Sequence, residues 1–299
     1  MNKVSYGGWD NCYKLSNDLV DLVITGDVGP RIIRFGFVDG PNVFKEFENM
    51  MGQTGGDEWR IYGGHRLWHA PEVEPRTYWP DNQPVNIEDH GDFVRTIQEA
   101  EPTTRLQKEM DIILSPDKAE VKVVHRIFNH HEWAAEFAPW ALSVMAPGGV
   151  GITPLPPRGT HPENLAPGNT LTLWTFTAMN DPRWTWGEKY ILLRQDTANS
   201  SPQKMGMANT VGWAAYANNG NMFVTNFSYD AKATYADMGC NFETFTNETM
   251  LEVETLGPLT RVEPGECVEH IETWQLFKDV PSPNNDADVD AHILPLLKG

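Results

Sequence analysis

The sequence predicts an all-β protein, built as an antiparallel sandwich or barrel of many strands, and three observations support this prediction. Apolar and polar residues alternate with a period of two along much of the 299-residue chain, as in strands with one buried face. Twenty-five glycines and 22 prolines interrupt these runs at short intervals, as turns do. Long amphipathic helical patterns are hard to find. Many short strands joined by turns are typical of a sandwich or barrel.

The strands are expected in a regular succession along the chain. Residues 19–26 (LVDLVITG) alternate and are rich in β-branched side chains, and residues 31–37 follow a Gly-Pro turn. Residues 136–149 form an apolar run that ends in Pro-Gly-Gly. The same patterns predict strands at 85–91, 93–100, 106–115, 120–129, 170–176, 190–196, 211–217, 221–229, 247–257 and 267–277.

No Gly/Ser linker and no tandem repeat divides the chain, so we expect residues 1–299 to form a single domain. The polar, acidic stretch 281–290 is expected to be a surface tail. Residues 292–297 (HILPLL) are apolar enough to dock back onto the sheet.

Composition excludes several classes of function. The net charge is −18, and such a surface repels phosphate backbones, so no nucleic-acid partner is expected. No apolar run reaches the roughly 18 residues of a membrane-spanning helix, and the N-terminus lacks a signal segment. Three scattered cysteines fit a reducing compartment, and we expect a cytoplasmic protein. No phosphate loop, nucleophile elbow or dinucleotide fingerprint is present, so no cofactor is expected.

The strand at 247–257 carries two carboxylates. Glu252 and Glu254 are two residues apart and therefore face the same side, whereas Leu251 and Val253 face the other. Leu-Gly-Pro at 256–258 ends the strand abruptly and places Glu254 close to its end. A half-solvated strand explains the pattern equally well.

Short motifs in both halves resemble the aldose 1-epimerase (galactose mutarotase-like) superfamily. In the C-terminal third they are Glu-Thr at 254–255, Pro-Gly-Glu at 264–266 and a strand ending in Trp-x-Leu-Phe at 274–277. LVITGDVGPRIIRFGF resembles the family's opening hairpin, and YGGHRLW resembles its glycine–arginine substrate loop. The resemblance implies a large twisted antiparallel β-sandwich, the fold called a supersandwich. It also implies a glutamate that acts as general base on the anomeric hydroxyl, which maps to Glu254, and a histidine that acts as general acid on the ring oxygen.

The expected acid histidine is missing. Its counterpart in the strand at 136–149 is Trp140. His130 and His131 lie nine to ten residues earlier beside a predicted turn, and adjacent turn histidines are commonly solvated. The site could therefore serve mutarotation with another acid, other chemistry, or binding alone.

The stretch YGGHRLWHAPE (62–72) concentrates titratable side chains. On a helix, His65, His69 and Glu72 could share a metal ion. On a strand the two histidines share a face but lie about 13 Å apart, and the flanking Gly-Gly and Ala-Pro disfavour a helix, so no metal site is predicted. Arg66 and Trp68 then occupy the opposite face, and a guanidinium suits hydroxyl or carboxylate oxygens.

Two further clusters are candidates for the sugar site. Arg183 and Trp184 lie in a turn with Asp181, although a salt-bridged turn capped by tryptophan explains them as well. Glu243 is a candidate second carboxylate in the cleft, and a calcium site with Asp237 and Asn241 stays open, without EF-hand spacing.

These observations predict a carbohydrate-active protein that epimerises a sugar or sugar derivative at the anomeric carbon. Glu254 is the predicted base, and His69 or His65 the predicted acid. The predicted ligand is a mono- or oligosaccharide, and the oligomeric state is left open. The alternatives are a non-catalytic carbohydrate-binding protein and a metal-assisted lyase or isomerase. The predicted substrate-binding residues are Arg66, Trp68, Glu72, Trp140, Arg183, Trp184 and Glu243.

Overall fold

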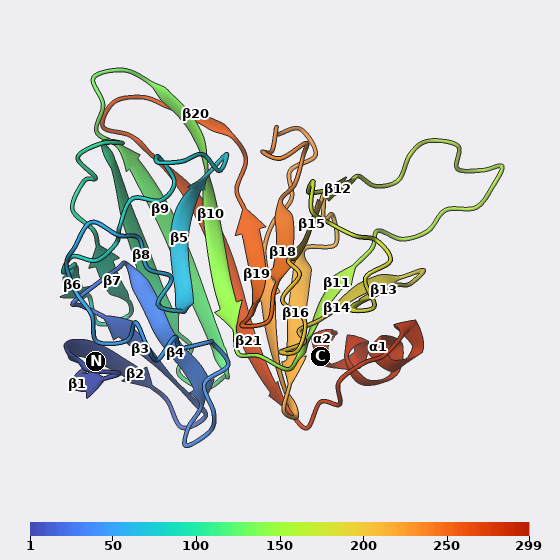
Figure 1. The fold of residues 1–299 in the computed structure, drawn as a ribbon, viewed down its shortest axis with the longest axis horizontal. Helices are drawn as coiled ribbons and strands as arrows, with labels where there is room; N and C mark the ends of the chain where they lie inside the picture. Colours follow the sequence, from blue (N-terminus) through green and yellow to red (C-terminus); the bar gives the residue numbers. More distant parts are fainter. Residues whose placement is uncertain (299) are drawn as a thin grey trace.

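Two large antiparallel sheets form the body of the protein in the computed structural model, which describes residues 1–298 (Figure 1). The first sheet has the order β1 (Asn2–Tyr6), β2 (Trp9–Ser16), β3 (Val20–Thr25), β4 (Arg31–Phe37), β5 (Gly64–Ala70), β10 (Ala135–Met145), β19 (Leu251–Leu256), β18 (Phe242–Thr246), β15 (Gln203–Met207) and β12 (Leu171–Leu173), with β20 (Thr260–Val262) paired to β10.

The second sheet faces the first. Its order is β13 (Trp184–Trp186), β14 (Tyr190–Arg194), β11 (Val150–Pro154), β16 (Trp213–Asn218), β17 (Asn221–Asn226), β21 (Cys267–Lys278), β9 (Glu120–Asn129), β8 (Leu106–Leu114), β7 (Val94–Ile97) and β6 (Asn86–Asp89). Every pairing in both sheets is antiparallel, so the predicted all-β sandwich is confirmed.

An aromatic cluster joins the two sheets. Phe35 of β4 packs against Trp274 of β21 with ring centroids 5.8 Å apart, and against Phe223 of β17 at 6.4 Å. All three side chains are at most 1 % exposed. Burial of such large rings supplies much of the apolar area that stabilises a sandwich core.

The central strands of the first sheet are in register at their charged residues. Arg66 of β5 lies opposite Leu142 of β10, which lies opposite Glu254 of β19. Glu254 in turn lies opposite Glu243 of β18. Paired residues of neighbouring strands point to the same face, so the pairing alone brings together residues nearly 190 positions apart in the sequence.

The C-terminal segment differs from the predicted tail. Residues Asp286–His292 form helix α1, whose N-cap Asn285 accepts a hydrogen bond from the Asp288 backbone N–H, and Leu294–Leu297 form the short helix α2. Val289 and Ile293 are fully buried against the second sheet. Two apolar residues among polar ones were too few for the sequence to predict a helix, but their packing fixes one.

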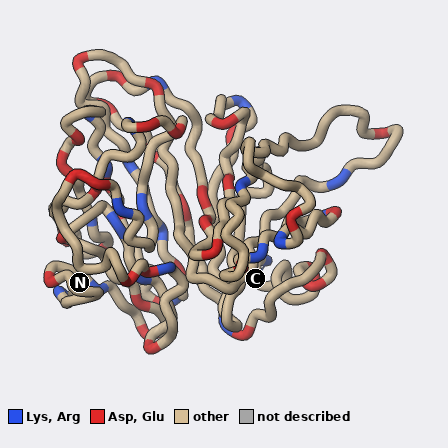
Figure 2. Tube along the Cα trace, viewed as in Figure 1, with Lys and Arg blue, Asp and Glu red and all other residues tan. Residues whose placement is uncertain are grey.

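No helix within residues 1–298 has the length and apolar character needed to cross a bilayer. The connection between β11 and β12 extends away from the two sheets (Figure 1). Acidic positions are spread over strands and loops of both sheets (Figure 2). The sequence did not predict strands β1, β2, β11, β13, β15, β18 and β20.

Candidate functional site

A cavity of about 420 Å³ lies over the outer face of the first sheet. Aromatic rings dominate its walls, and they come from strands and from the long connections around them. The aromatic lining residues are Phe47, Trp59, Trp68, Tyr78, Trp140, Trp174, Phe176 and Phe245. Polar groups are few by comparison, which is the composition of a small-molecule site.

Lys204 lies in the cavity floor between two buried carboxylates. Its Nζ is 2.8 Å from Glu243 Oε2 and 3.1 Å from Glu254 Oε2. It also lies 4.7 Å from the ring centroids of both Trp140 and Trp174. Trp140 donates its indole N–H to the same Glu254 oxygen at 3.0 Å. Lys204 and Trp140 line the cavity, and the two glutamates lie beneath them, fully buried.

Burial sets the protonation behaviour of this cluster. It raises the pKa of Glu254 to about 7 and that of Glu243 to about 8, although the Lys204 charge opposes both shifts. Burial alone would lower the pKa of Lys204, but the two carboxylates outweigh it and raise that pKa. Near neutral pH the cluster therefore holds a lysinium and two carboxyl groups that can each gain or lose a proton.

Arg66 provides the second cation of the cavity. Its Nη2 donates to Glu252 Oε1 at 3.0 Å, and its guanidinium carbon lies 4.5 Å from the Trp68 ring centroid and 5.6 Å from that of Trp59. Its Nε and Nη1 are buried without a hydrogen-bond partner among residues 1–298. A ligand oxygen would satisfy these donors.

Glu72 lines the cavity from the connection after β5. Tyr78 donates its phenol O–H to Glu72 Oε1, and its ring packs edge-on against Trp59 and Trp68. Burial and this carboxylate raise the pKa of Tyr78, so the phenol stays protonated. Of the predicted substrate-binding residues, Arg66, Trp68, Glu72 and Trp140 line the cavity directly.

The predicted acids His65 and His69 do not reach this cavity, which corrects the sequence prediction for them. They alternate with Arg66 and Trp68 along β5 and point to the other face, as strand geometry requires. His65 Nε2 contacts His125 Nε2 of the second sheet at 2.7 Å. His69 lines a separate cavity. Neither ring faces Glu254. Glu72 lines the aromatic cavity on the other side of β5, so His65, His69 and Glu72 do not converge on one point.

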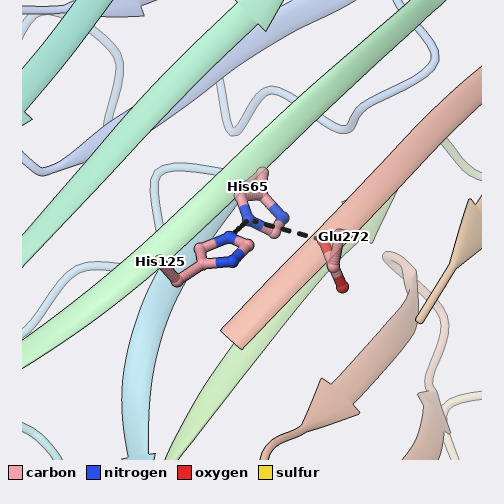
Figure 3. Close-up of side chains that lie close together, drawn as sticks. All are labelled: His65, His125 and Glu272. Atoms are coloured by element: carbon pink, nitrogen blue, oxygen red, sulfur yellow. Dashed lines mark hydrogen bonds and ion pairs between the residues drawn. The ribbon is translucent and has the colours of Figure 1, made fainter. Parts of the chain in front are cut away.

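His65 belongs to a buried polar network between the sheets (Figure 3). His125 Nδ1 faces the His270 carbonyl oxygen at 3.0 Å and must donate to it, so His125 Nε2 accepts from His65 Nε2–H. His65 Nδ1 then accepts from the Ser143 hydroxyl at 2.9 Å. Both imidazoles are thus neutral and satisfied, in agreement with their lowered pKa values, which burial causes.

Glu272 approaches this network. Its Oε2 lies 3.9 Å from His65 Nε2 (Figure 3) and accepts the Trp274 indole N–H at 2.8 Å. Among residues 1–298, one set of three His, Cys, Asp or Glu side chains has ligand atoms close enough to share a metal ion, and it consists of His65, His125 and Glu272. The Nε2 atoms of the two imidazoles, however, lie at hydrogen-bond distance from each other. This distance is shorter than the distance between two nitrogen ligands of one zinc ion.

Arg183 and Trp184 lie outside the candidate site, which corrects their predicted role. Arg183 forms a bidentate pair with Asp181 at 2.8 and 3.0 Å. Trp184 is buried and donates to the Gln203 side chain. The salt-bridged turn capped by tryptophan is what the structure shows.

A calcium site at Asp237, Asn241 and Glu243 is not formed. The Asn241 side chain bonds to the backbone of Asn209 in both directions, and Glu243 pairs with Lys204. The Asn241 carboxamide is therefore held by backbone groups, and a lysine ammonium already lies beside Glu243, so these side chains do not form a shared set of oxygen ligands.

Lys204 and the pairing role of Glu252 were not predicted from the sequence. Lys204 stands in QKMGM, a five-residue segment of weak alternation that did not predict a strand. The signal that could have revealed it is a single charge beside the apolar residues Met205 and Met207, because buried lysines are rare without carboxylate partners.

Comparisons with known proteins agree with this architecture. No family model and no curated protein matches the chain. A provisionally assigned aldose 1-epimerase from Klebsiella pneumoniae superposes with a TM-score of 0.62 at 11 % identity, covering 99 % of this chain and 86 % of its own. A galactose mutarotase-like protein from Lactobacillus casei gives 0.59 at 10 % identity, covering 89 % and 100 %.

The chain has the galactose mutarotase-like fold. A galactose mutarotase related enzyme from Lactobacillus acidophilus gives the same result, with a TM-score of 0.55 at 10 % identity over 91 % of this chain and 99 % of its own. Identities this low are evidence for the fold and leave the chemistry to be argued from the residues of the site.

Proposed function

We propose that the aromatic cavity binds a sugar and that the protein interconverts its anomers by acid–base catalysis. The observation that carries the proposal is the cluster of Lys204, Glu254 and Glu243 under an aromatic wall. In the proposed reaction the Glu254 carboxylate takes the proton of the anomeric hydroxyl. Lys204 gives a proton to the ring oxygen, the ring opens, and both transfers reverse when it closes on the other face.

Several features support this assignment of roles. Glu254 has a pKa of about 7, which suits a base at neutral pH. Lys204 is the cation in contact with both Glu254 and the cavity. The guanidinium of Arg66 offers a planar set of donors suited to bind oxygens, and the indoles of Trp68 and Trp140 offer flat apolar surface to a pyranose ring.

A second candidate is sugar binding without catalysis. Glu254 is fully buried and already accepts hydrogen bonds from Trp140 and Lys204. A sugar hydroxyl can reach its carboxylate only if Lys204 or Trp140 moves aside. If they do not move, the cavity binds its ligand and leaves the anomers unchanged.

Anomer exchange measured by magnetisation-transfer NMR on a panel of aldoses tests the proposal. We expect accelerated exchange for at least one sugar, and a loss of roughly 100-fold or more in Glu254→Gln and in Lys204→Gln. Arg261→Gln, an exposed change on β20, serves as control. Binding without faster exchange would establish the second candidate. Exchange that survives in Glu254→Gln would remove Glu254 as the base.

A further inference from the structure

A second cavity, of about 330 Å³, lies on the opposite side of β5 from the aromatic cavity. It forms where the ends of β5, β8 and β10 meet three loops. Its lining residues are His69, Pro75, Arg76, Thr103, Thr104, Leu106, His131, Ala135, Glu136 and Phe137. The proposed sugar chemistry uses none of them.

His69 is buried in this cavity without hydrogen bonds. Its side chain is 1 % exposed, and neither ring nitrogen has a partner among residues 1–298. The ring packs edge-on against Phe137 at 6.4 Å. Burial, with the charges of Lys108 and Arg76, lowers its pKa to about 3, so the ring is neutral and offers one donor and one acceptor. A buried polar group left unpaired is costly, and a ligand would relieve the cost.

Arg76 offers a second free donor. Its Nη2 donates to the Pro71 carbonyl at 2.7 Å, but its Nε is buried without a partner among residues 1–298. Lys108 adds positive charge nearby, although it is paired with Glu101. Among the lining residues the single carboxylate, Glu136, is exposed. Two cations therefore surround His69 in a chain whose net charge is −18.

We propose that this cavity is a second ligand site and that it takes a small organic carboxylate. The carboxylate accepts hydrogen bonds from the His69 ring N–H and the Arg76 Nε–H, a charge-assisted arrangement that suits a guanidinium. The apolar body of the ligand packs against Leu106 and Phe137. A neutral molecule of the same shape leaves the arginine without a charged partner.

The site shares one segment with the aromatic cavity. Pro75 and Arg76 face the second cavity, whereas Glu72 and Tyr78 of the same connection face the first. The two ligands thus contact the same short stretch of chain, while β5 separates them with Trp68 on one face and His69 on the other.

Titration of the full-length protein with sodium benzoate, followed by NMR of the His69 ring and of Leu106 and Phe137 side chains, tests the proposal. We expect saturable shifts of all three residues. Benzyl alcohol, which has the same ring and no charge, should bind at least about tenfold more weakly. Equal binding of the two compounds, or benzoate shifts confined to residues of the aromatic cavity, would overturn the proposal.

Three variants test whether benzoate binds in the second cavity. Arg76→Gln, a half-buried position, should weaken benzoate binding roughly tenfold or more, because it removes a charged donor. Arg105→Gln makes the same change at an exposed position of the neighbouring loop that does not line the cavity, and should bind as the wild type does. Ala135→Leu should block binding by filling the cavity. Equal losses in the two arginine variants would mean general electrostatic attraction, and the site would be rejected.

Discussion

Lys204 is the residue on which the candidate site depends, because it is the cation that Glu243 and Glu254 share. Replacing it with methionine leaves two buried carboxyl groups without a counter-charge. We expect the free energy of unfolding at pH 8 to fall by about 3–5 kcal/mol, the range for breaking a buried ion pair. The loss should be smaller at pH 6, where both carboxyl groups can be protonated in the folded state.

Urea denaturation at the two pH values measures this effect. Lys232→Met is the matched control, since Lys232 is exposed, and it should change stability by less than about 0.5 kcal/mol. A loss in Lys204→Met that is the same at pH 6 and pH 8 would contradict the shared-cation interpretation.

The indole N–H of Trp140 donates a hydrogen bond to the Glu254 carboxylate. Trp140→Phe keeps an aromatic ring but removes a donor to the charged form of Glu254. Because that hydrogen bond favours ionisation, its loss should raise the pKa of Glu254 by about one unit. ¹³C NMR titration of the glutamate carboxyl groups measures the shift. An unchanged or lowered pKa would show that the indole does not stabilise the carboxylate.

Strand β5 illustrates how far the sequence determines the position of single residues. The alternation of Arg66 and Trp68 with His65 and His69 was predictable, because strand periodicity alone determines it. Which face carries the aromatic cavity was not predictable, since both faces of β5 are buried and polar groups lie on both. The sequence predicts the acid on the face of His65 and His69, whereas Lys204, the proposed acid, lies on the face of Arg66.

At the scale of elements, the two glycines that precede His65 determine where β5 begins. Gly64 has a φ of +71°, and a Cβ there would lie 2.4 Å from the Ile32 carbonyl oxygen. Gly64→Ala therefore forces β4 and β5 apart next to Arg66. We expect it to lower the free energy of unfolding by at least about 3 kcal/mol, because backbone atoms rather than a side-chain tip must move.

Gly55 provides the control for this prediction. Its φ of +64° is similar, but nothing lies within 4 Å of the point that a Cβ would occupy. Gly55→Ala should lower the free energy of unfolding by only about 1–2 kcal/mol, the cost of holding a non-glycine residue in the left-handed conformation. Thermal or urea unfolding distinguishes the two variants, and equal losses would mean that the close approach at Gly64 is relieved at little cost.

Elements with strong alternation were predictable, and elements defined by tertiary contacts were not. The expected strand at 267–277 corresponds to β21 almost residue for residue. The three-residue strands β13 and β20 are too short for periodicity to be informative. Helix α1 depends on the burial of Val289 and on the Asn285 cap, and neither can be inferred from a short acidic segment.

For the whole molecule, the two-sheet architecture followed from the pattern and from the family motifs, whereas the polar interior between the sheets was not foreseen. His125 and His270 lie in two strands that are far apart in the sequence, and their pairing across β9 and β21 depends on the register of these strands. Buried networks of this kind depend on which strands become neighbours, and a single sequence does not contain that information.

The buried titratable groups predict the pH dependence of stability for the whole molecule. Folding lowers the pKa of His69 and His125 to about 3 and that of His270 to about 4, so the unfolded chain binds more protons below pH 6.5 and stability falls with acidification there. Folding raises the pKa of Glu243 to about 8 and that of Glu254 and Glu272 to about 7. These carboxyl groups stabilise the folded state most below their unfolded pKa near 4.5, and lose that contribution as the pH rises through 7–8.

The buried histidines and the buried carboxyl groups act in opposite directions. As the pH is lowered, the unfolding free energy should rise from pH 8 to about pH 6.5 and fall steeply below about pH 4.5. Between pH 6.5 and pH 4.5 the two contributions partly cancel, since each titrating residue contributes at most about 1.4 kcal/mol per pH unit. Urea denaturation from about pH 3.5 to 8.5 measures the profile. Glu272→Gln, which keeps a hydrogen-bonding side chain at that site, should flatten the rise above pH 6.5 but leave the acid limb in place. A stability that decreases steadily from pH 8 to pH 6 would show that these carboxyl groups are not held in a raised-pKa state by the fold.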